Sequence, residues 1–250
     1  MQRLLWIAML LASPLALADS HTADTGPVME TFRCDFHEGK GPDDIWASAE
    51  FFNQQVDKMN SEALNSYFAA VLLPFRASME GDYGWIGEWP SLRTMARGLQ
   101  DYYASPLSAA VEKRFAEVAD CRANTWFVED LVDNYPDDDA TPLQDAVEIY
   151  SCTLRDGVTM AQVSSAEQAF VKANGEAPVA VQRWTPFLAN TPADLAYLVA
   201  HEDIGSFADF NAAWLASEAG RANQAAFAEV MDCESGLYTG RVLREPASTM

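Results

Sequence analysis

The order of apolar and polar positions along the chain predicts two similar successions of strands and helices. Short apolar or alternating runs indicate strands, and apolar residues spaced three or four apart indicate helices. The first succession is strand, helix, strand, strand, helix, strand, and covers 31–35, 45–60, 66–78, 83–89, 92–103 with 109–118, and 123–132. The second repeats this order over 146–154, 163–174, 177–187, 195–202, 204–217 with 221–231, and 236–243. The pattern therefore predicts an α+β protein with two equivalent parts.

The two parts are also related residue by residue. The stretch Pro74–Cys121 recurs as Pro186–Cys233 at a constant offset of 112 residues, and fourteen of the 48 aligned pairs are identical. The identical pairs include the run Phe-Ala-Glu-Val-x-Asp-Cys that ends each stretch. Self-similarity at a fixed offset is typical of repeated structural units. We therefore expect a tandem duplication of one domain of about 100 residues.

The start of the chain has the pattern of a secretory signal peptide. One arginine precedes the apolar run 4–11, and Ala16 and Ala18 supply the small residues of a cleavage site. A membrane anchor is the alternative, but this run is too short to cross about 30 Å of hydrocarbon. The predicted organisation is a signal peptide over 1–18, a flexible leader over 19–30, a first repeat over 31–133, a linker over 134–145, a second repeat over 146–243 and a tail over 244–250. We expect a periplasmic or secreted protein that is not inserted in the membrane after cleavage.

Four cysteines fit an exported protein with two disulfides. Three pairings are possible for four cysteines. Each repeat contains one early and one late cysteine, so the duplication favours Cys34–Cys121 and Cys152–Cys233. There is no Cys-x-x-Cys spacing, so a zinc site is not expected, and no other metal site is predicted.

The net charge limits the kinds of molecule that the protein is expected to bind. The formal charge is −21, and removal of residues 1–18 takes away Arg3 and no acidic residue, which leaves −22. Nucleic acid binding requires clustered lysine and arginine, so it is not expected. The acidic residues are interpreted as a solvated surface, and attraction of cationic substrates or metal ions is the alternative.

The third strand of the first repeat resembles a known superfamily. Its sequence Trp-x-Gly-x-Trp, from Trp85 to Trp89, runs through Pro90 and Ser91 into a helix. With the order strand, helix, strand, strand, helix, strand, this resembles the ferredoxin-like domains of the dimeric α+β barrel superfamily. The resemblance covers both repeats and implies two four-stranded sheets that face each other as one barrel. It implies a monomer with an internal pseudo-dimer. It also places each early cysteine beside the late cysteine of its repeat.

The alternation of the third strands suggests a candidate binding site. One face carries Trp85, Trp89, Tyr197 and His201, and the other carries mostly small residues. We predict that the bulky face lines the space between the two sheets, where it would bind a small apolar or aromatic ligand. The alternative is that these side chains only fill the barrel.

His201 has three possible roles. It could serve as a general base at neutral pH or as a ligand to iron, but an ordinary hydrogen-bonded histidine is favoured. Members of the resembled superfamily include haem-degrading and quinone-forming monooxygenases, dye-type peroxidases and chlorite dismutases. None of their catalytic residues can be transferred to this chain, and the sequence contains no Gly-x-Ser-x-Gly, His-Glu-x-x-His or Walker motif.

The sequence thus predicts an exported small-molecule-binding or structural protein with an aromatic-lined barrel and no cofactor. The alternative is a barrel enzyme such as a cofactor-free or haem-linked monooxygenase.

Overall fold

A computed structural model describes residues 26–77, 81–134, 146–174 and 178–247. The predicted signal peptide and nearly all of the predicted linker lie outside these residues. The strands are β1 (Val28–Phe36), β2 (Phe68–Ala77), β3 (Tyr83–Trp89), β4 (Ala119–Asp133), β5 (Ala146–Leu154), β6 (Ala180–Leu188), β7 (Leu195–His201) and β8 (Met231–Arg244). The helices are α1 (Pro42–Met59), α2 (Glu62–Asn65), α3 (Leu92–Ala104), α4 (Ser108–Ala116), α5 (Met160–Asn174), α6 (Ile204–Ala216) and α7 (Glu218–Val230).

The eight strands form one closed antiparallel barrel. Their order around the barrel is β1-β3-β2-β8-β5-β7-β6-β4, and β4 pairs again with β1. The first four strands of the chain are neighbours, as are the last four. Two seams, β2 with β8 and β4 with β6, join these halves. Every described strand therefore has a hydrogen-bonded neighbour on both sides, and a single chain completes the barrel.

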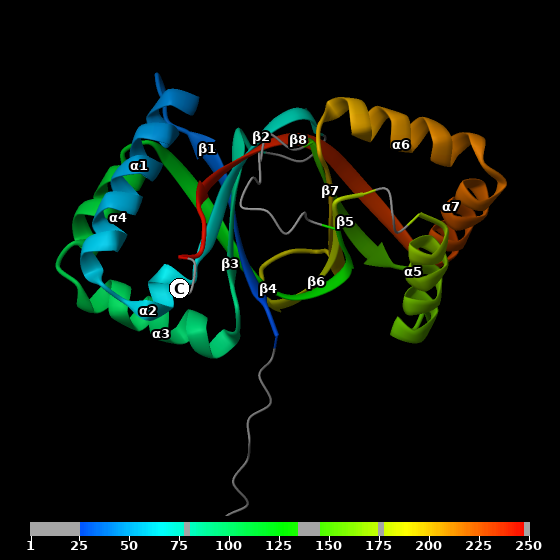
Figure 1. Ribbon diagram of the computed structural model, residues 1–250, viewed down its shortest axis with the longest axis horizontal. Coiled ribbons are helices and arrows are strands. Elements are labelled where there is room, and N and C mark those ends of the chain that lie inside the picture. Colours follow the sequence, from blue (N-terminus) through cyan, green and yellow to red (C-terminus); the bar gives the residue numbers. More distant parts are fainter. Residues whose placement is uncertain (1–25, 78–80, 135–145, 175–177, 248–250) are drawn as a thin grey trace, which may run out of the picture.

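The helices cover the outer face of the barrel in two groups. Helices α1 to α4 lie against the first four strands, and α5 to α7 lie against the last four (Figure 1). Side chains alternate along each strand, so one set points toward the helices and the other into the barrel. Each half therefore has a helix-facing layer, and the two halves share the barrel interior. Among the described helices, none is long and apolar enough to cross a membrane.

The helices begin where the sequence supplies capping groups. The Ser91 hydroxyl accepts a hydrogen bond from the Thr94 amide at the start of α3, and the Asp203 carboxylate caps α6 through the Ser206 amide. Helix α1 has Pro42 at its first position and two aspartates in its first turn. Such caps satisfy amides that have no partner within the helix.

Several element ends differ from the prediction. Strand β1 begins at Val28, within the predicted leader, because Val28 and Met29 are fully buried in the core. Strand β4 begins at Ala119 although its first residues are polar, because that end pairs with β1 in register. The predicted tail is not separate either, since Arg244 ends β8 and the Ala247 amide donates to the Asn65 carbonyl at 2.7 Å.

Both predicted disulfides are confirmed. Cys34 bonds to Cys121, and Cys152 bonds to Cys233. In each case the two cysteines are direct partners on adjacent antiparallel strands, β1 with β4 and β5 with β8. Each bond thus connects the first and last strands of its half.

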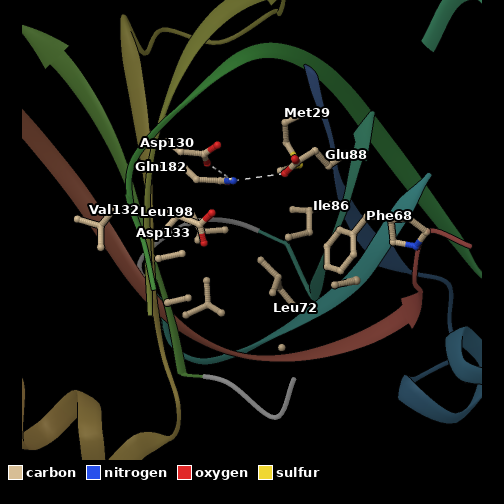
Figure 2. Close-up of a pocket in the computed structure, with 16 residues that line it drawn as sticks. Met29, Phe68, Leu72, Ile86, Glu88, Asp130, Val132, Asp133, Gln182 and Leu198 are labelled. Atoms are coloured by element: carbon tan, nitrogen blue, oxygen red, sulfur yellow. Dashed lines mark hydrogen bonds between the residues drawn. The ribbon is translucent and has the colours of Figure 1, made fainter. Parts of the chain in front are cut away.

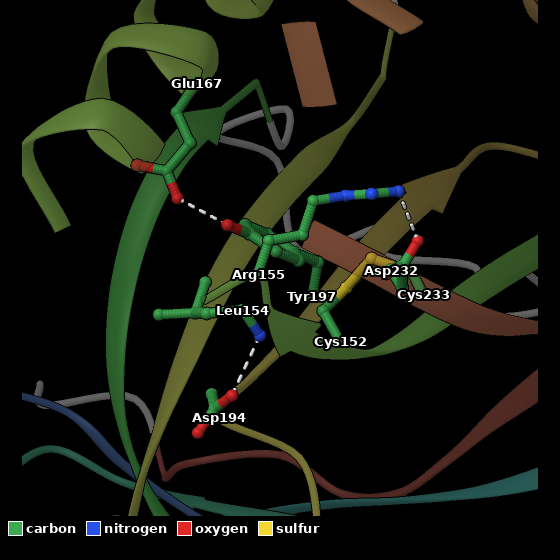
Figure 3. The surroundings of a disulfide bond; sticks show 8 residues. All are labelled: Cys152, Leu154, Arg155, Glu167, Asp194, Tyr197, Asp232 and Cys233. Atoms are coloured by element: carbon green, nitrogen blue, oxygen red, sulfur yellow. Dashed lines mark hydrogen bonds and ion pairs between the residues drawn. A yellow bond between two sulfur atoms is a disulfide. The ribbon is translucent and has the colours of Figure 1, made fainter. Parts of the chain in front are cut away.

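A conserved turn geometry joins each disulfide to the start of the third strand. The Asp82 amide donates to the Cys34 carbonyl at 2.8 Å, and its carboxylate accepts from the Phe36 amide. Asp194 makes the same two bonds in the second half, with Cys152 and Leu154 (Figure 3). These aspartates, at equivalent positions of the two halves, are therefore turn residues with a defined structural role.

Candidate functional site

The four residues predicted to line the space between the sheets lie on the opposite face of their strands. Trp85 and Trp89 are packed under the helices of the first half. Tyr197 is packed against α5 in the second half, and His201 contacts Phe207 and Phe210 of α6. The predicted orientation of β3 and β7 is therefore wrong.

The barrel interior is lined instead by the alternate set of small and aliphatic residues. Ile86, Glu88, Leu198 and Ala200 point into it, together with Met29 and Leu72 (Figure 2). The physical reason lies on other strands. Trp126 of β4 and Trp184 of β6 enter the barrel with ring centroids 6.3 Å apart. Their indoles occupy part of the interior, and the inward side chains of β3 and β7 are smaller than the aromatic residues on the other face of these strands.

A cavity of about 350 Å³ remains in the barrel interior, and we call it the lumen cavity. Its polar residues are Glu88, Asp130, Asp133 and Gln182. The Gln182 Nε2 donates to Glu88 at 3.3 Å and to Asp130 at 3.0 Å, and its Oε1 accepts from the Trp184 indole at 3.1 Å. Burial, with added repulsion from Asp130 and Asp133, raises the pKa of Glu88 despite the bond from Gln182. This arrangement holds a carboxyl group at reduced acidity but brings no cation to it.

A larger cavity of about 580 Å³ lies in the second half between the sheet and helices α5, α6 and α7. We call it the helix-side cavity. Its floor includes Val181 and Val199 from the sheet, and disulfide-bonded Cys152 and Cys233 lie at its edge. Tyr197, one of the four predicted site residues, lines it. An apolar cavity with a few polar groups is the common form of a small-molecule site.

Four aromatic rings from the helices form one wall of the helix-side cavity. Phe170 lies at the centre, with its centroid 6.4 Å from Phe210, 6.1 Å from Trp214 and 6.2 Å from Phe227. Phe210 and Trp214 are stacked, with an angle of 12° between their planes. The Trp214 indole N–H is buried and has no hydrogen-bond partner among the described residues. The four rings make this wall of the cavity apolar and aromatic.

Glu167 connects the aromatic wall to the sheet. This residue of α5 is 3% exposed. One carboxylate oxygen accepts from the Tyr197 hydroxyl at 2.7 Å (Figure 3), and the other accepts from Arg183 Nη1 at 2.7 Å. Arg183 also pairs with Glu129 on β4. Burial, reinforced by Glu167, raises the pKa of Tyr197, so its hydroxyl stays protonated as a donor.

Glu148 is the second carboxylate that lines the helix-side cavity. It accepts a hydrogen bond from the Tyr150 hydroxyl at 2.7 Å, and its other oxygen lies 3.2 Å from His201 Nε2. The His201 side chain is fully buried, and its Nδ1 has no hydrogen-bond partner within the part of the chain that the structure describes. His201 does not itself line the cavity, but it contacts Phe210 of the aromatic wall.

The corresponding layer of the first half is filled with side chains. Glu30 and Glu148 each lie four residues before the first cysteine of their half. Glu30 accepts a hydrogen bond at 2.6 Å from the indole of Trp89, which takes the place of His201. Trp85, in the place of Tyr197, makes edge contacts with Phe52 and Phe115. The two halves thus use the same carboxylate position in different surroundings, one packed and one beside a cavity.

Sequence reasoning missed the acidic residues of both cavities. A signal for Glu167 was present, because it follows Val163 by four residues and precedes Phe170 by three, on the buried face of its helix. The Glu30 and Glu148 pair was also visible from the cysteine alignment. Among the described residues, no group of histidine, cysteine, aspartate and glutamate side chains is arranged to hold a metal ion.

No protein-family model and no curated protein matches this chain at the level of sequence. Solved structures do match its fold. A candidate monooxygenase from Fusobacterium nucleatum superposes with a TM-score of 0.61 at 7% identity, over 89% of this chain and 96% of that one. A dye-decolorizing peroxidase from Bacteroides thetaiotaomicron gives 0.53 at 7% identity, over 86% and 93%.

A haem-binding protein from Thermus thermophilus gives a TM-score of 0.50 at 11% identity, over 86% of this chain and 91% of that one. Identities this low establish the architecture and no activity. With its eight-stranded antiparallel barrel and outer helices, this chain has a fold similar to that of the dimeric α+β barrel proteins.

Proposed function

We propose that the protein is an exported small-molecule-binding protein that holds its ligand in the helix-side cavity. The observation that carries this proposal is the difference between the halves. The helix-facing layer of the first half packs Trp85, Trp89 and their aromatic neighbours together, whereas that of the second half contains a cavity of about 580 Å³. Pockets that bind small molecules commonly have about 300–1,000 Å³. The aromatic wall indicates an apolar or aromatic ligand.

Haem is the cofactor that the structural neighbours suggest, and the cavity does not fit it. No histidine lines the cavity, and both of its cysteines are in a disulfide. The hydroxyls of Tyr150 and Tyr197 are held by Glu148 and Glu167, and burial raises the pKa of both phenols. Met231 is the remaining lining residue of a type that ligates haem iron. The lining also contains no arginine or lysine to pair with the haem carboxylates.

The second candidate is a cofactor-free oxygenase, and one observation favours it. Glu148 lines the cavity and would act as the general base toward a bound substrate, with the buried His201 as its hydrogen-bond partner. The monooxygenase among the structural neighbours is in line with this alternative. An oxygenase would consume dioxygen in the presence of its ligand, and a binding protein would release the ligand unchanged.

The chain also has features of an internal duplication and of export from the cytoplasm. We infer two ferredoxin-like repeats, 31–133 and 146–243, that arose by tandem duplication and follow a cleaved signal peptide. The matched order of elements, the matched disulfides and the equivalent aspartate turns support the duplication. Two disulfides are also what an oxidising compartment permits.

The test uses two substitutions on neighbouring residues of β7. Val199→Phe adds volume inside the helix-side cavity, and Leu198→Phe adds a smaller volume inside the lumen cavity. Protein expressed in the periplasm is titrated with the neutral apolar dye Nile red. We expect Val199→Phe to weaken binding at least about tenfold, while Leu198→Phe leaves it unchanged, since a filled pocket loses the ligand's contacts. The reverse result would move the site to the lumen, and no binding by the unmodified protein would refute the proposal.

A further inference from the structure

We propose that the helix-side cavity selects a hydrophobic organic cation, an amine or quaternary ammonium group carried on an apolar or aromatic body. This inference rests on the proposed function and specifies its ligand. It depends on the charges at the cavity wall, the aromatic faces around them and the contrast with the first half.

The first step is the charge of the cavity wall. Among the described residues, its lining contains two carboxylates, Glu148 and Glu167, and no lysine, arginine or histidine. Glu167 is compensated from behind, because Arg183 donates to it at 2.7 Å. The same arginine also pairs with Glu129, so this group of three keeps an excess negative charge. An anionic ligand would therefore meet only like charge.

The second step identifies Glu148 as the contact for the cation. Its side chain is only 12% exposed, so the carboxylate is poorly solvated. Its hydrogen-bond partners are the Tyr150 hydroxyl and His201, and neither is a lysine or arginine. A carboxylate at a low-dielectric wall without a permanent cationic partner interacts strongly with a charge that enters the cavity.

The third step is the aromatic wall. Indole and phenyl faces attract cations through their ring quadrupoles, and the attraction is larger when the cation is desolvated. Trp214 and Phe210 present parallel rings, and Phe170 stands edge-on to Trp214. Aromatic rings and a carboxylate that line the same cavity are a combination that accommodates alkylammonium groups.

The fourth step is the contrast between the halves. Glu30, at the place of Glu148, is closed off by the indole of Trp89, which donates to it at 2.6 Å. Burial raises the pKa of Glu30, so it is the protonated form that this packed environment favours. In the second half the tryptophan is replaced by His201, and the carboxylate borders open space. Both halves thus have a glutamate at this position, and of the two, Glu148 is the one that borders the helix-side cavity.

The net charge of the whole molecule also favours a cationic ligand. A formal charge of −21 produces a negative potential that concentrates cations near the surface and speeds their association. This long-range effect is screened at high ionic strength.

The experiment compares three probes that share one ring system and differ in charge. They are the cation of 1-naphthylmethylamine, the neutral 1-naphthalenemethanol and the anion 1-naphthaleneacetate. Affinities for the full-length mature protein are measured by calorimetry at neutral pH and constant ionic strength. We expect the amine to bind at least about tenfold more tightly than the alcohol, and the acetate to bind most weakly. Glu148→Gln should reduce the ratio of amine to alcohol affinity to near one while it preserves the affinity for the alcohol. Glu88→Gln, which alters a carboxylate of the lumen cavity, should leave the ratio unchanged.

The outcomes separate the two proposals. Equal binding of all three probes, or tighter binding of the acetate, would overturn the cation inference and leave the binding function intact. Absence of binding by all three, together with absence of Nile red binding, would overturn the binding function itself. A preference for the amine that persists in Glu148→Gln would assign the selection to another group and contradict the role given to Glu148.

Discussion

Glu167 links three parts of the second half, because one carboxylate on α5 bonds to Tyr197 of β7 and to Arg183 of β6. Its side chain is 4% exposed and that of Arg183 is 11% exposed. Loss of one member of such a buried pair leaves the other charge without compensation. Substitution of Glu167 should therefore destabilise the folded protein mainly because Arg183 loses its buried partner.

We predict that Glu167→Ala lowers the free energy of unfolding by about 2–3 kcal/mol. It removes the buried partner of Arg183, which then pairs only with the more exposed Glu129, and it leaves the Tyr197 hydroxyl without its acceptor. Glu129→Ala removes the exposed partner of the same arginine and should cost about 1 kcal/mol or less. Urea denaturation monitored by circular dichroism measures both. Equal losses in the two variants would show that Glu167 is not the principal partner of Arg183.

Glu88 affects how the stability of the folded protein depends on pH. Burial raises its pKa above the ordinary value of 4.5. Between that value and the raised one, the folded protein holds more protons than the unfolded chain, so the stability contributed by this group decreases as the pH rises. At neutral pH the full cost of ionising a buried carboxyl is present.

We therefore expect Glu88→Gln to be more stable than the unmodified protein at pH 7, with a Tm higher by about 2–4 °C, the shift that 1 kcal/mol produces in a protein of this size. The difference should disappear below pH 4. Thermal unfolding across pH 3.5–8 measures it, with Glu38→Gln on the exposed loop as the control. A lower Tm at pH 7 would mean that the bond from Gln182 outweighs the cost of burial.

At the scale of elements, α3 approaches β3 so closely that a glycine is required. A Cβ on Gly98 would lie 2.3 Å from a carbon of the Trp89 ring. Trp89 is 2% exposed and its indole is bonded to Glu30, so the ring cannot move aside. The packing of this helix on its strand therefore outweighs the poor helix propensity of glycine.

Gly98→Ala should thus destabilise the protein by about 1–3 kcal/mol through overpacking, although alanine gains about 1 kcal/mol in intrinsic helix propensity. Its effect should shrink or change sign in a Trp89→Phe background, where the ring atoms that clash are absent. A double-mutant cycle in guanidinium measures this coupling. Additive effects of the two substitutions would show that α3 and β3 are not in such close contact.

The disulfides join the first and last strands of each half, with sequence separations of 87 and 81 residues. Because the loops are nearly equal in length, replacement of either pair by alanine should cost a similar amount, about 2–5 kcal/mol. Denaturation of the two double variants without reductant tests this. If one pair proved nearly neutral, its half would be held together by packing alone.

The elements that could be predicted were those whose residues specify a local geometry. The alternating residues 83–89 match β3 at both ends, and the recurrence of the cysteines specified their pairing. The start of β4 was missed because its residues are polar and only pairing with β1 holds them in a strand.

The orientation of the strands could not be obtained from alternation alone. Alternation separates two faces but does not say which one is inside. That choice depended on Trp126 and Trp184, which occupy the barrel from distant positions in the sequence. The helix-side cavity was equally inaccessible, because it depends on how three helices fill space over the sheet and not on any one motif.

At the scale of the whole molecule, the two seams of the barrel connect halves that are far apart in the sequence. β2 pairs with β8 and β4 pairs with β6, so neither half has a free sheet edge among the described strands. Exposed edges favour association with other chains. A barrel closed in this way does not need a second copy.

We accordingly predict a monomer that unfolds in a single cooperative transition, since neither sheet can close a barrel without the other. Light scattering coupled to size exclusion should give the mass of one chain, close to the 27.5 kDa of the full sequence less the proposed signal peptide. Calorimetric and van't Hoff enthalpies should agree. A dimer, or two separate transitions, would indicate that the seams are weaker than their pairing suggests.

One chain supplies both halves of this barrel, and that removes a constraint. When two identical chains build such a barrel, a two-fold axis obliges every substitution to appear twice, so a residue that opens space on one side opens it on the other. Here Trp89 and His201 occupy equivalent positions and are encoded separately. One half can therefore remain a solid support while the other is free to change its interior, and a single polypeptide can divide these tasks between its two ends.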